Sequence, residues 1–436
     1  MNKKESYIIL TILTFIFLLV APGTIYYSQG YRLSFDKNSK QFRIFQVGGI
    51  AFEIDQSGAN ISIDKKQDRK EVSGGKKILI DNLKPGIHNF LIEKEGFQPW
   101  SKNLEIYEKQ VTDAKNIVLF QDKYKFQDFE VKDLKNISDF FEFPDKNKLT
   151  LLSRTDDTWN LTIYNPSNKA QESIFNTSSS IAFNGIEFLS EDKAIINAGK
   201  DFVAINLKKK IQKSFNTKKD AQSFLYEIPT SSPAIASTSL AYQIIDNNMI
   251  YFAKDGIVYK TDLSGKNSSQ LTKEKIDLVG IKDAKIIILD RNIFFIASGN
   301  LYILDQVRGQ LLFLQDNVED IILSPDKKKV AINAKHEIMI FYLQEQSGQL
   351  HYDKGQKVFL DRFSQKISNL QWLDDFHLIA NFDNNIKAMS IDNRDTINIA
   401  QITDFPSSRF LFLPELKKII VSSNNKIIIS QEQLIQ

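Results

Sequence analysis

The sequence feature that most constrains this chain is an uncharged apolar stretch close to its first residue. The stretch covers residues 7–27, so it is 21 residues long, and it follows a short charged segment at residues 1–5. As an α-helix it would extend about 31 Å, which matches the hydrocarbon thickness of a bilayer. The sequence therefore predicts that residues 1–30 form a cytoplasmic stub and a single transmembrane anchor.

A cleavable signal peptide is the alternative reading of the same stretch. Residues 8–21 form a block of 14 apolar or threonine residues, the length of a signal-peptide hydrophobic region, and Ser28-Gln29-Gly30 offers small residues for a peptidase. Against cleavage, Ile25-Tyr26-Tyr27 prolongs the apolar run, and paired tyrosines suit the membrane interface. The uncleaved anchor is favoured, and both readings export the rest of the chain.

Charge and cysteine usage indicate where the body of the protein lies. Lys3-Lys4 precedes the apolar stretch, and positive residues tend to stay in the cytoplasm. Four basic residues follow the stretch and weaken this bias, namely Arg32, Lys37, Lys40 and Arg43. We expect a cytoplasmic N-terminus and an extracytoplasmic body, at the cell surface or in the periplasm. The chain has no cysteine, which excludes disulfides, thiol catalysis, thiolate metal sites and lipid attachment through cysteine.

Composition is that of a globular protein without a nucleic-acid partner. The chain is 42% hydrophobic and 25% charged, and 56 basic residues nearly balance 53 acidic ones. Nucleic-acid binding requires a net basic footprint, which this balance does not provide. Short basic runs at 208–210, 327–329 and 417–418 are typical of solvated turns between strands.

Beyond the apolar stretch the pattern predicts an all-β body, and residues 42–120 predict a small antiparallel β-sandwich. Ala59, Ile61 and Ile63 alternate with polar residues, and a second strand follows at 78–80. Leu83-Lys84-Pro85-Gly86 predicts a type II turn, because proline fixes the first central φ and glycine supplies the second. Further strands are expected at 88–92, 104–106 and 117–120, and the nearest approach to an amphipathic helix is 213–225. That helix pattern is weak.

The sandwich region resembles the PEGA domain over its whole length. The resemblance rests on Gly48-Gly49-Ile50-Ala51-Phe52-Glu53-Ile54, Gly58-Ala59-Asn60-Ile61-Ser62-Ile63-Asp64, Leu83-Lys84-Pro85-Gly86 and Ile92-Glu93-Lys94-Glu95-Gly96-Phe97-Gln98-Pro99-Trp100. Three turn positions depart from the family pattern: Gln56-Ser57-Gly58-Ala59, Asp64-Lys65 and Ser73-Gly74-Gly75. The resemblance implies a non-catalytic β-sandwich outside the cell that serves as a surface or binding module.

Residues 124–436 show internal repetition of a hydrophobic strand, an acidic or Asn-rich turn and an alternating strand. The copies are Phe143-Pro144-Asp145, Leu189-Ser190-Glu191-Asp192, Asp246-Asn247-Asn248, Asp290-Arg291-Asn292, Leu323-Ser324-Pro325-Asp326, Leu373-Asp374-Asp375 and Leu413-Pro414-Glu415. Asp145 and Glu415 are 270 residues apart, so six intervals give a period of about 45, that of a propeller blade. Asp255-Gly256 predicts a hairpin within one unit.

This period predicts a β-propeller, because units of three or four strands bury their faces only by stacking around a centre. Residues 249–271 and 321–341 resemble the WD40-like blades of TolB-type propellers, except that Lys327 replaces the glycine that usually follows the Asp. Seven blades fit the spacing best, with six or eight as alternatives. Residues 126–131 are a candidate for the last strand of the final blade.

A search for catalytic, metal or cofactor chemistry in the sequence finds no site. His88, His336, His351 and His377 lack the spacing of metal ligands, and His88 is expected in the sandwich core. The acidic pairs at 156–157 and 374–375 could bind calcium or act as a carboxylate pair, but solvated turns are favoured for both. The three tryptophans are expected to pack in cores, Trp372 between blades and Trp100 in the sandwich, with Trp159 unassigned.

Two functions from different classes follow. The favoured hypothesis is a membrane-anchored binding or scaffold protein, with no cofactor and no catalytic residues, that recognises an envelope protein or glycan. The alternative is a glycan lyase or hydrolase with its site over the propeller axis, built by residues from different blades. A sensor role is disfavoured because too few residues precede the anchor for a cytoplasmic output domain.

Overall fold

The computed structural model describes most of the chain. The described residues are 3–36, 41–64, 66–71, 77–229, 239–245, 249–275, 284–348, 350–406, 409–424 and 426–435. The chain divides into two compact units. The first contains residues up to 122 together with 393–398 and residue 435, and the second contains 123–392 and 399–434.

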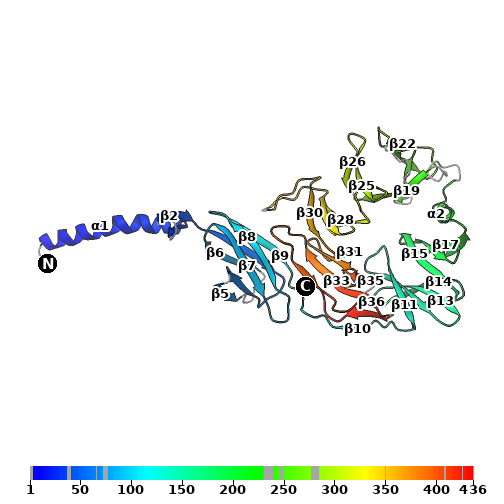
Figure 1. Ribbon diagram of the computed structural model, residues 1–436, viewed down its shortest axis with the longest axis horizontal. Coiled ribbons are helices and arrows are strands. Elements are labelled where there is room, and N and C mark those ends of the chain that lie inside the picture. The colour runs from blue at the N-terminus through cyan, green and yellow to red at the C-terminus, as the bar shows by residue number, and fades with distance from the viewer. Residues whose placement is uncertain are drawn as a thin grey trace. The chain divides into compact units, whose positions relative to one another are not determined.

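Helix α1 (Lys3–Ser28) begins the first unit (Figure 1). Within it, Tyr7–Ser28 has a mean hydropathy of 2.5 and none of it is buried against the rest of the protein. The helix continues through Pro22 and Gly23. The segment is long and apolar enough to cross a membrane, and a signal sequence would have the same properties.

In the region of the predicted sandwich the chain forms two sheets, of order β6-β3-β9 and β5-β4-β7-β8. The strands are β3 (Gly48–Ile54), β4 (Asn60–Ile63), β5 (Lys66–Glu71), β6 (Lys77–Leu83), β7 (Gly86–Glu93), β8 (Trp100–Ile106) and β9 (Val111–Ile117). One expectation is wrong in detail: β9 runs parallel to β3, so the sandwich is not wholly antiparallel. In place of the strand expected at 117–120, the structure has β9, which lies earlier in the chain.

One apolar core joins the two sandwich sheets. Phe52 of β3 and Phe90 of β7 are both fully buried, and their rings meet edge to face with centroids 5.4 Å apart. Trp100 packs edge to face on Phe52 at 6.4 Å, which confirms its predicted place in the core. Because the two rings come from different sheets, this aromatic contact holds the sheets face to face.

Glycines allow the close backbone approaches of this sandwich. A Cβ on Gly48 would lie 2.2 Å from the carbonyl oxygen of Tyr107, so no other residue fits there. Gly86 has a φ of +128°, and with Pro85 it turns the chain from one sheet to the other. The expected turn residues at 73–75 lie outside the described residues.

Residues 393–398 also belong to the first unit, which the sequence did not indicate. Lys102 of β8 is buried, and its Nζ donates hydrogen bonds to the carbonyl oxygens of Arg394 (2.7 Å) and Thr396 (2.9 Å). The Asn103 backbone N–H and side chain both donate to the Asp395 carboxylate at 2.9 Å. A buried ammonium is stable only when its donors are satisfied, and these carbonyls satisfy two of them.

The second unit contains seven four-stranded antiparallel sheets among its described residues. The first sheet contains β11 (Ile137–Glu142), β12 (Leu149–Arg154), β13 (Thr158–Tyr164) and β14 (Gln171–Ser178). The second contains β15 (Phe183–Ser190), β16 (Lys193–Ala198), β17 (Asp201–Asn206) and β18 (Ile211–Phe215). The third contains β19 (Ser239–Ile245), β20 (Met249–Lys254), β21 (Ile257–Asp262) and β22 (Ser269–Gln270). The fourth contains β23 (Ala284–Leu289), β24 (Asn292–Ala297), β25 (Asn300–Asp305) and β26 (Gln310–Gln315). The fifth contains β27 (Asp320–Leu323), β28 (Lys329–Ala334), β29 (Glu337–Tyr342) and β30 (Lys357–Arg362). The sixth contains β31 (Ile367–Trp372), β32 (His377–Phe382), β33 (Asn385–Ser390) and β34 (Ile399–Gln401). The seventh is β10 (Phe126–Asp128) with β35 (Arg409–Leu413), β36 (Lys418–Ser423) and β37 (Lys426–Ser430).

The turn motif that repeats in the sequence recurs at the same place in these sheets. Six of the seven copies of the turn motif lie between the first and second strands of a sheet, and the copy at 246–248 lies outside the described residues between β19 and β20. Asp255 and Gly256 both have positive φ, 51° and 81°, which confirms the hairpin between β20 and β21. Lys327 has a φ of +58°, so it holds the conformation that a glycine would adopt more easily.

The seven sheets follow one another along a curved path, and the last lies beside the first (Figure 1). Strand β10 pairs with β37 through Phe126↔Ser430, Gln127↔Ile429 and Asp128↔Ile428. The Phe129 N–H extends the pairing to the carbonyl oxygen of Ile427 at 2.9 Å. The two ends of the second unit therefore share one sheet, as predicted for residues 126–131.

Contacts between neighbouring sheets are apolar, with a few hydrogen bonds. Leu151 and Leu411 belong to one buried cluster that joins the first sheet to the last. Trp372 of β31 donates from Nε1 to the carbonyl oxygen of Ile322 in the preceding sheet at 3.0 Å, so its predicted place between sheets is confirmed. Trp159 is partly buried in the cluster between the first two sheets.

We expect Phe90→Ala to lower the free energy of unfolding of the sandwich by about 3–5 kcal/mol, because it removes a fully buried ring. In a Trp159→Phe, Trp372→Phe background, Trp100 fluorescence reports this unit during urea unfolding. Ile87→Ala on the same strand is the control, since Ile87 is 74% exposed and should change stability by less than about 0.5 kcal/mol. Equal effects of the two substitutions would contradict the described core.

Candidate functional site

Helix α2 (Lys218–Tyr226) lies between the second and third sheets of the second unit. The sequence only weakly indicated a helix here, and the structure divides that region into β18 and α2. Thr217 caps the helix by accepting the Asp220 N–H at 3.1 Å, and Glu227 ends it with a left-handed φ of 54°. Ala221, Leu225 and Tyr226 are buried against both sheets, so the helix fills the space between them.

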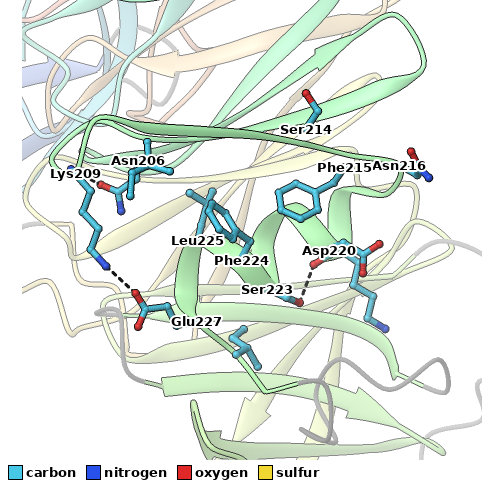
Figure 2. A pocket seen from close by; sticks show the side chains of 13 residues that line it. Asn206, Lys209, Ser214, Phe215, Asn216, Asp220, Ser223, Phe224, Leu225 and Glu227 are labelled. Atoms are coloured by element: carbon cyan, nitrogen blue, oxygen red, sulfur yellow. Dashed lines mark hydrogen bonds and ion pairs between the residues drawn. The ribbon is translucent and has the colours of Figure 1, made fainter.

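A pocket of about 870 Å³ lies beside α2 and β18 (Figure 2). The residues that line it come from β17, β18, α2 and the turns that connect them: Asn206, Lys209, Ile211, Ser214, Phe215, Asn216, Lys219, Asp220, Ser223, Phe224, Leu225, Glu227 and Ile228. Phe215 and Phe224 pack with ring centroids 5.3 Å apart. Lys213 places its Nζ 5.4 Å and 5.3 Å from the same two rings. The pocket therefore combines an aromatic surface with charged groups, as binding sites for protein segments do.

Two charged groups that line this pocket, Lys209 and Glu227, form an ion pair. Lys209 Nζ lies 2.6 Å from Glu227 Oε1, as Figure 2 shows. The hydrogen bond from Lys209 lowers the pKa of the Glu227 carboxyl, and burial lowers the pKa of Lys219. Glu227 therefore stays ionised at neutral pH. These groups offer charge and hydrogen bonds for recognition.

Strand β18 is the outer strand of its sheet and borders a second pocket. Ile211 and Phe215 line the larger pocket, whereas Gln212 and Lys213 line a neighbouring one of about 500 Å³. An outer strand presents backbone N–H and C=O groups to which an extended segment can add as a further strand. The α2–β18 surface, defined by β18, α2 and these two pockets, can thus contact a partner through main chain and side chains.

Side chains on the first strands of the sheets connect neighbouring sheets. Arg409 of β35 lies 3.4 Å from Asp139 of β11, joining the last sheet to the first. The Gln371 side chain accepts the Phe412 N–H from the next sheet at 3.0 Å. The glycan lyase or hydrolase hypothesis requires acidic and basic groups that converge on a substrate. Arg409, Asp139 and Gln371 instead contact adjacent sheets and stabilise the packing of one sheet on the next.

The four histidines lie apart from one another. His88 does not belong to the sandwich core in which it was expected. Its side chain is 14% exposed, with Nδ1 2.7 Å from Asp64 Oδ2 and Nε2 2.6 Å from the Lys84 carbonyl oxygen. His336 and the exposed His351 each contact a nearby loop oxygen. Among the described residues, no group of three histidine or acidic side chains is placed to hold a metal ion.

The repeated turn motif pairs an acid with a basic residue at or just before the start of the second strand. The pairs are Asp145–Lys148 at 3.0 Å, Asp192–Lys193 at 3.7 Å, Asp326–Lys329 at 2.7 Å and Asp374–His377 at 3.0 Å. Lys329 and His377 are buried, so their partners compensate for lost hydration. In these four copies of the motif, the acid is therefore explained by turn structure.

The two acidic pairs of the sequence differ in their surroundings. Asp156-Asp157 lies in an exposed turn, as expected. Asp374 and Asp375 are engaged by protein groups: His377 contacts Asp374, and Asp375 accepts the Asp326 N–H at 2.8 Å. Burial raises the pKa of Asp374, but the His377 side chain and the backbone N–H groups of Phe376 and His377 together lower it by more, so the net pKa is lowered. Burial and the nearby Asp326 raise the pKa of Asp375.

No protein-family model matches the sequence, and no curated protein matches it. Among solved structures, a chain of the mitotic checkpoint complex is 9% identical with a TM-score of 0.42, and the match covers 72% of this chain and 93% of that chain. The Cps50 (Swd1) β-propeller domain of Myceliophteria thermophila is 10% identical with a TM-score of 0.42, covering 71% of this chain and 100% of that one. YCF48 from Cyanidioschyzon merolae is 13% identical with a TM-score of 0.40, covering 70% and 98%.

We expect Asp374→Asn to lower the free energy of unfolding by about 1–3 kcal/mol at neutral pH, because buried His377 loses a charged partner. A carboxyl with a lowered folded pKa stabilises the fold above its ordinary pKa of 3.8, and this contribution disappears as pH falls through the folded value. The difference between variant and parent should therefore shrink on acidification, as measured by urea unfolding across the acid range.

Asp375→Asn is the matched control for this substitution. Because the pKa of the Asp375 carboxyl is raised, its ionised form is disfavoured. An asparagine oxygen at this position still accepts the Asp326 N–H. Stability at neutral pH should be unchanged or higher. If Asp375→Asn destabilised the fold as much as Asp374→Asn, the assignment of Asp374 as the partner of His377 would fail.

Proposed function

We propose that this protein is a membrane-anchored, extracytoplasmic binding or scaffold protein that recognises an envelope protein or glycan without catalysis. The observation that carries the proposal is helix α1, whose 22-residue apolar segment is not buried in the rest of the protein. An apolar helix left uncovered in water would be costly, and a bilayer is the environment that removes this cost. The β-rich remainder of the chain is then held close to a membrane surface.

Orientation in this proposal follows from the basic residues Lys3-Lys4 before the helix. Positive residues are retained in the cytoplasm, so the N-terminus lies inside and the two compact units lie outside. The absence of cysteine agrees with units that are held together by apolar cores such as that around Phe52 and Phe90.

In this proposal the sandwich is a PEGA-type module, and the second unit is a seven-bladed β-propeller. Support for the first comes from Gly48 and Gly86, motif glycines whose backbone geometry requires glycine. Support for the second comes from the seven successive four-stranded sheets and the shared sheet of β10 and β37. Both architectures present binding surfaces on loops and outer strands.

The α2–β18 surface is the proposed recognition site. It combines an available outer strand, the ring pair Phe215–Phe224 and the charged pair Lys209–Glu227. An extended protein segment would satisfy all three, through main-chain hydrogen bonds, an apolar side chain and a charged rim.

We expect Val307→Cys to be labelled by a membrane-impermeant maleimide in intact cells, because the Val307 side chain is 91% exposed and the chain has no other cysteine. Lys4→Cys, before the apolar helix, is the control and should be labelled only after lysis. Labelling with the opposite pattern would overturn the proposed topology.

We expect a photo-crosslinking amino acid at Ile211 to form adducts with envelope components in intact cells, at a yield several-fold above that at Ile399. The two isoleucines are matched, since each lies on the outer strand of its sheet and their exposures are 44% and 40%. Adducts would be measured by gel shift and mass spectrometry. Equal yields at both positions would contradict recognition through the α2–β18 surface.

A further inference from the structure

A two-stranded hairpin follows α1 and carries one strongly apolar face. Strand β1 (Tyr31–Asp36) pairs with β2 (Gln41–Gln46), with Leu33 opposite Ile44 and Phe35 opposite Phe42. Opposite residues in a ladder lie on the same face, as do alternate residues of a strand. These four side chains therefore form one apolar face, and they are exposed by 65%, 69%, 50% and 69% in the order named.

The other face of the hairpin contacts protein. Arg32 donates a hydrogen bond to the side chain of Asn82, and Lys84 lies with its Nζ 5.9 Å from the ring of Phe45. Arg32 and Phe45 are opposite each other in the ladder, so they share the face that alternates with the apolar one. The hairpin thus has one face against the turn between β6 and β7, whereas the four apolar side chains of its other face are exposed in the described part of the chain.

The junction of hairpin and helix is held by several contacts. The Arg32 guanidinium lies 3.8 Å from the centre of the Tyr27 ring, and its Nη1 donates to the Tyr27 carbonyl oxygen at 2.8 Å. Tyr26 and Tyr31 meet edge to face with centroids 5.3 Å apart. The Val47 N–H donates to the carbonyl oxygen of Gly30 at 2.9 Å, which fixes the base of the hairpin two residues after the helix ends.

We propose that the Leu33–Phe35–Phe42–Ile44 face lies on the lipid bilayer, in its interfacial layer on the side where α1 emerges. Membrane anchoring by α1, part of the proposed function, is the premise. The apolar surface of α1 continues through Tyr26, Tyr27 and Tyr31 to this face, and tyrosine rings favour the interface. Strands at this depth keep their backbone groups paired or hydrated, so a hairpin can lie there.

This placement has a consequence for the first unit. A single helix leaves the attached body free to tilt, whereas a helix plus an adjoining apolar face gives two points of attachment to the same bilayer. The Arg32–Asn82 and Lys84–Phe45 contacts connect this second point to the sandwich. The hairpin would hold the sandwich close to the lipid surface.

The test uses full-length protein in liposomes with one environment-sensitive dye per molecule, which the absence of native cysteine allows. Dye is attached at Ile44→Cys and Leu33→Cys on the apolar face, at Ser34→Cys on the alternating position, and at Phe15→Cys within α1. Lipids carry a nitroxide quencher either near the headgroup or near the acyl-chain end. We expect dyes at 33 and 44 to be quenched several-fold more by the headgroup quencher than the dye at 34.

The Phe15 reporter separates failure of this inference from failure of its premise. Quenching of the dye at 15 by the deep quencher, with none at 33 and 44, would leave the anchor intact and overturn the inference. A blue-shifted dye at 44 without lipid quenching would also overturn it, since a protein surface would then cover the face. Absence of quenching at 15 would refute the membrane anchor and, with it, the interfacial hairpin.

Discussion

The second unit depends on one pairing, that of β10 with β37. Strand β10 precedes all other strands of this unit, and β37 is the last strand, so their ladder joins residues about three hundred positions apart. Sheets that contact only their neighbours leave exposed faces at the two ends of the series, and terminal apolar faces in water destabilise the whole series. In this unit the shared sheet covers the two end faces, since Leu411 of the last sheet packs with Leu151 of the first.

Because its two ends share one sheet, the second unit is a stable support for elements outside the sheets, such as helix α2. Helix α2 fills the space between two sheets and carries one side of the α2–β18 surface, while its buried residues Leu225 and Tyr226 keep it in place. The acid–base pairs at the turns of four sheets, such as Asp326–Lys329, stabilise those sheets from within. Packing of this kind needs no disulfide, in agreement with a chain that lacks cysteine.

Much of this fold could be predicted because it follows from local pattern. Alternating residues such as Ile61 and Ile63 predicted strands, and the spacing of acidic turns predicted the sheets. Strand β5 was missed because its sequence, KQDRKE, is wholly polar, as edge strands often are. The α2–β18 surface could not be predicted, since it arises from contacts such as Phe215–Phe224 between separate elements. The inclusion of residues 393–398 in the first unit likewise depends on tertiary contacts alone.

The pairing of β10 with β37 can be tested directly by disulfide crosslinking in the full-length protein. Gln127 and Ile429 are opposite in the ladder, where Cα atoms lie about 4.5–5.5 Å apart, within reach of a disulfide. Gln127→Cys with Ile429→Cys should crosslink nearly completely under mild oxidation and raise the urea midpoint of the oxidised protein. Gln127→Cys with Lys426→Cys, three residues out of register, should crosslink poorly. Equal crosslinking of both pairs, or none in the matched pair, would contradict the shared sheet on which this account rests.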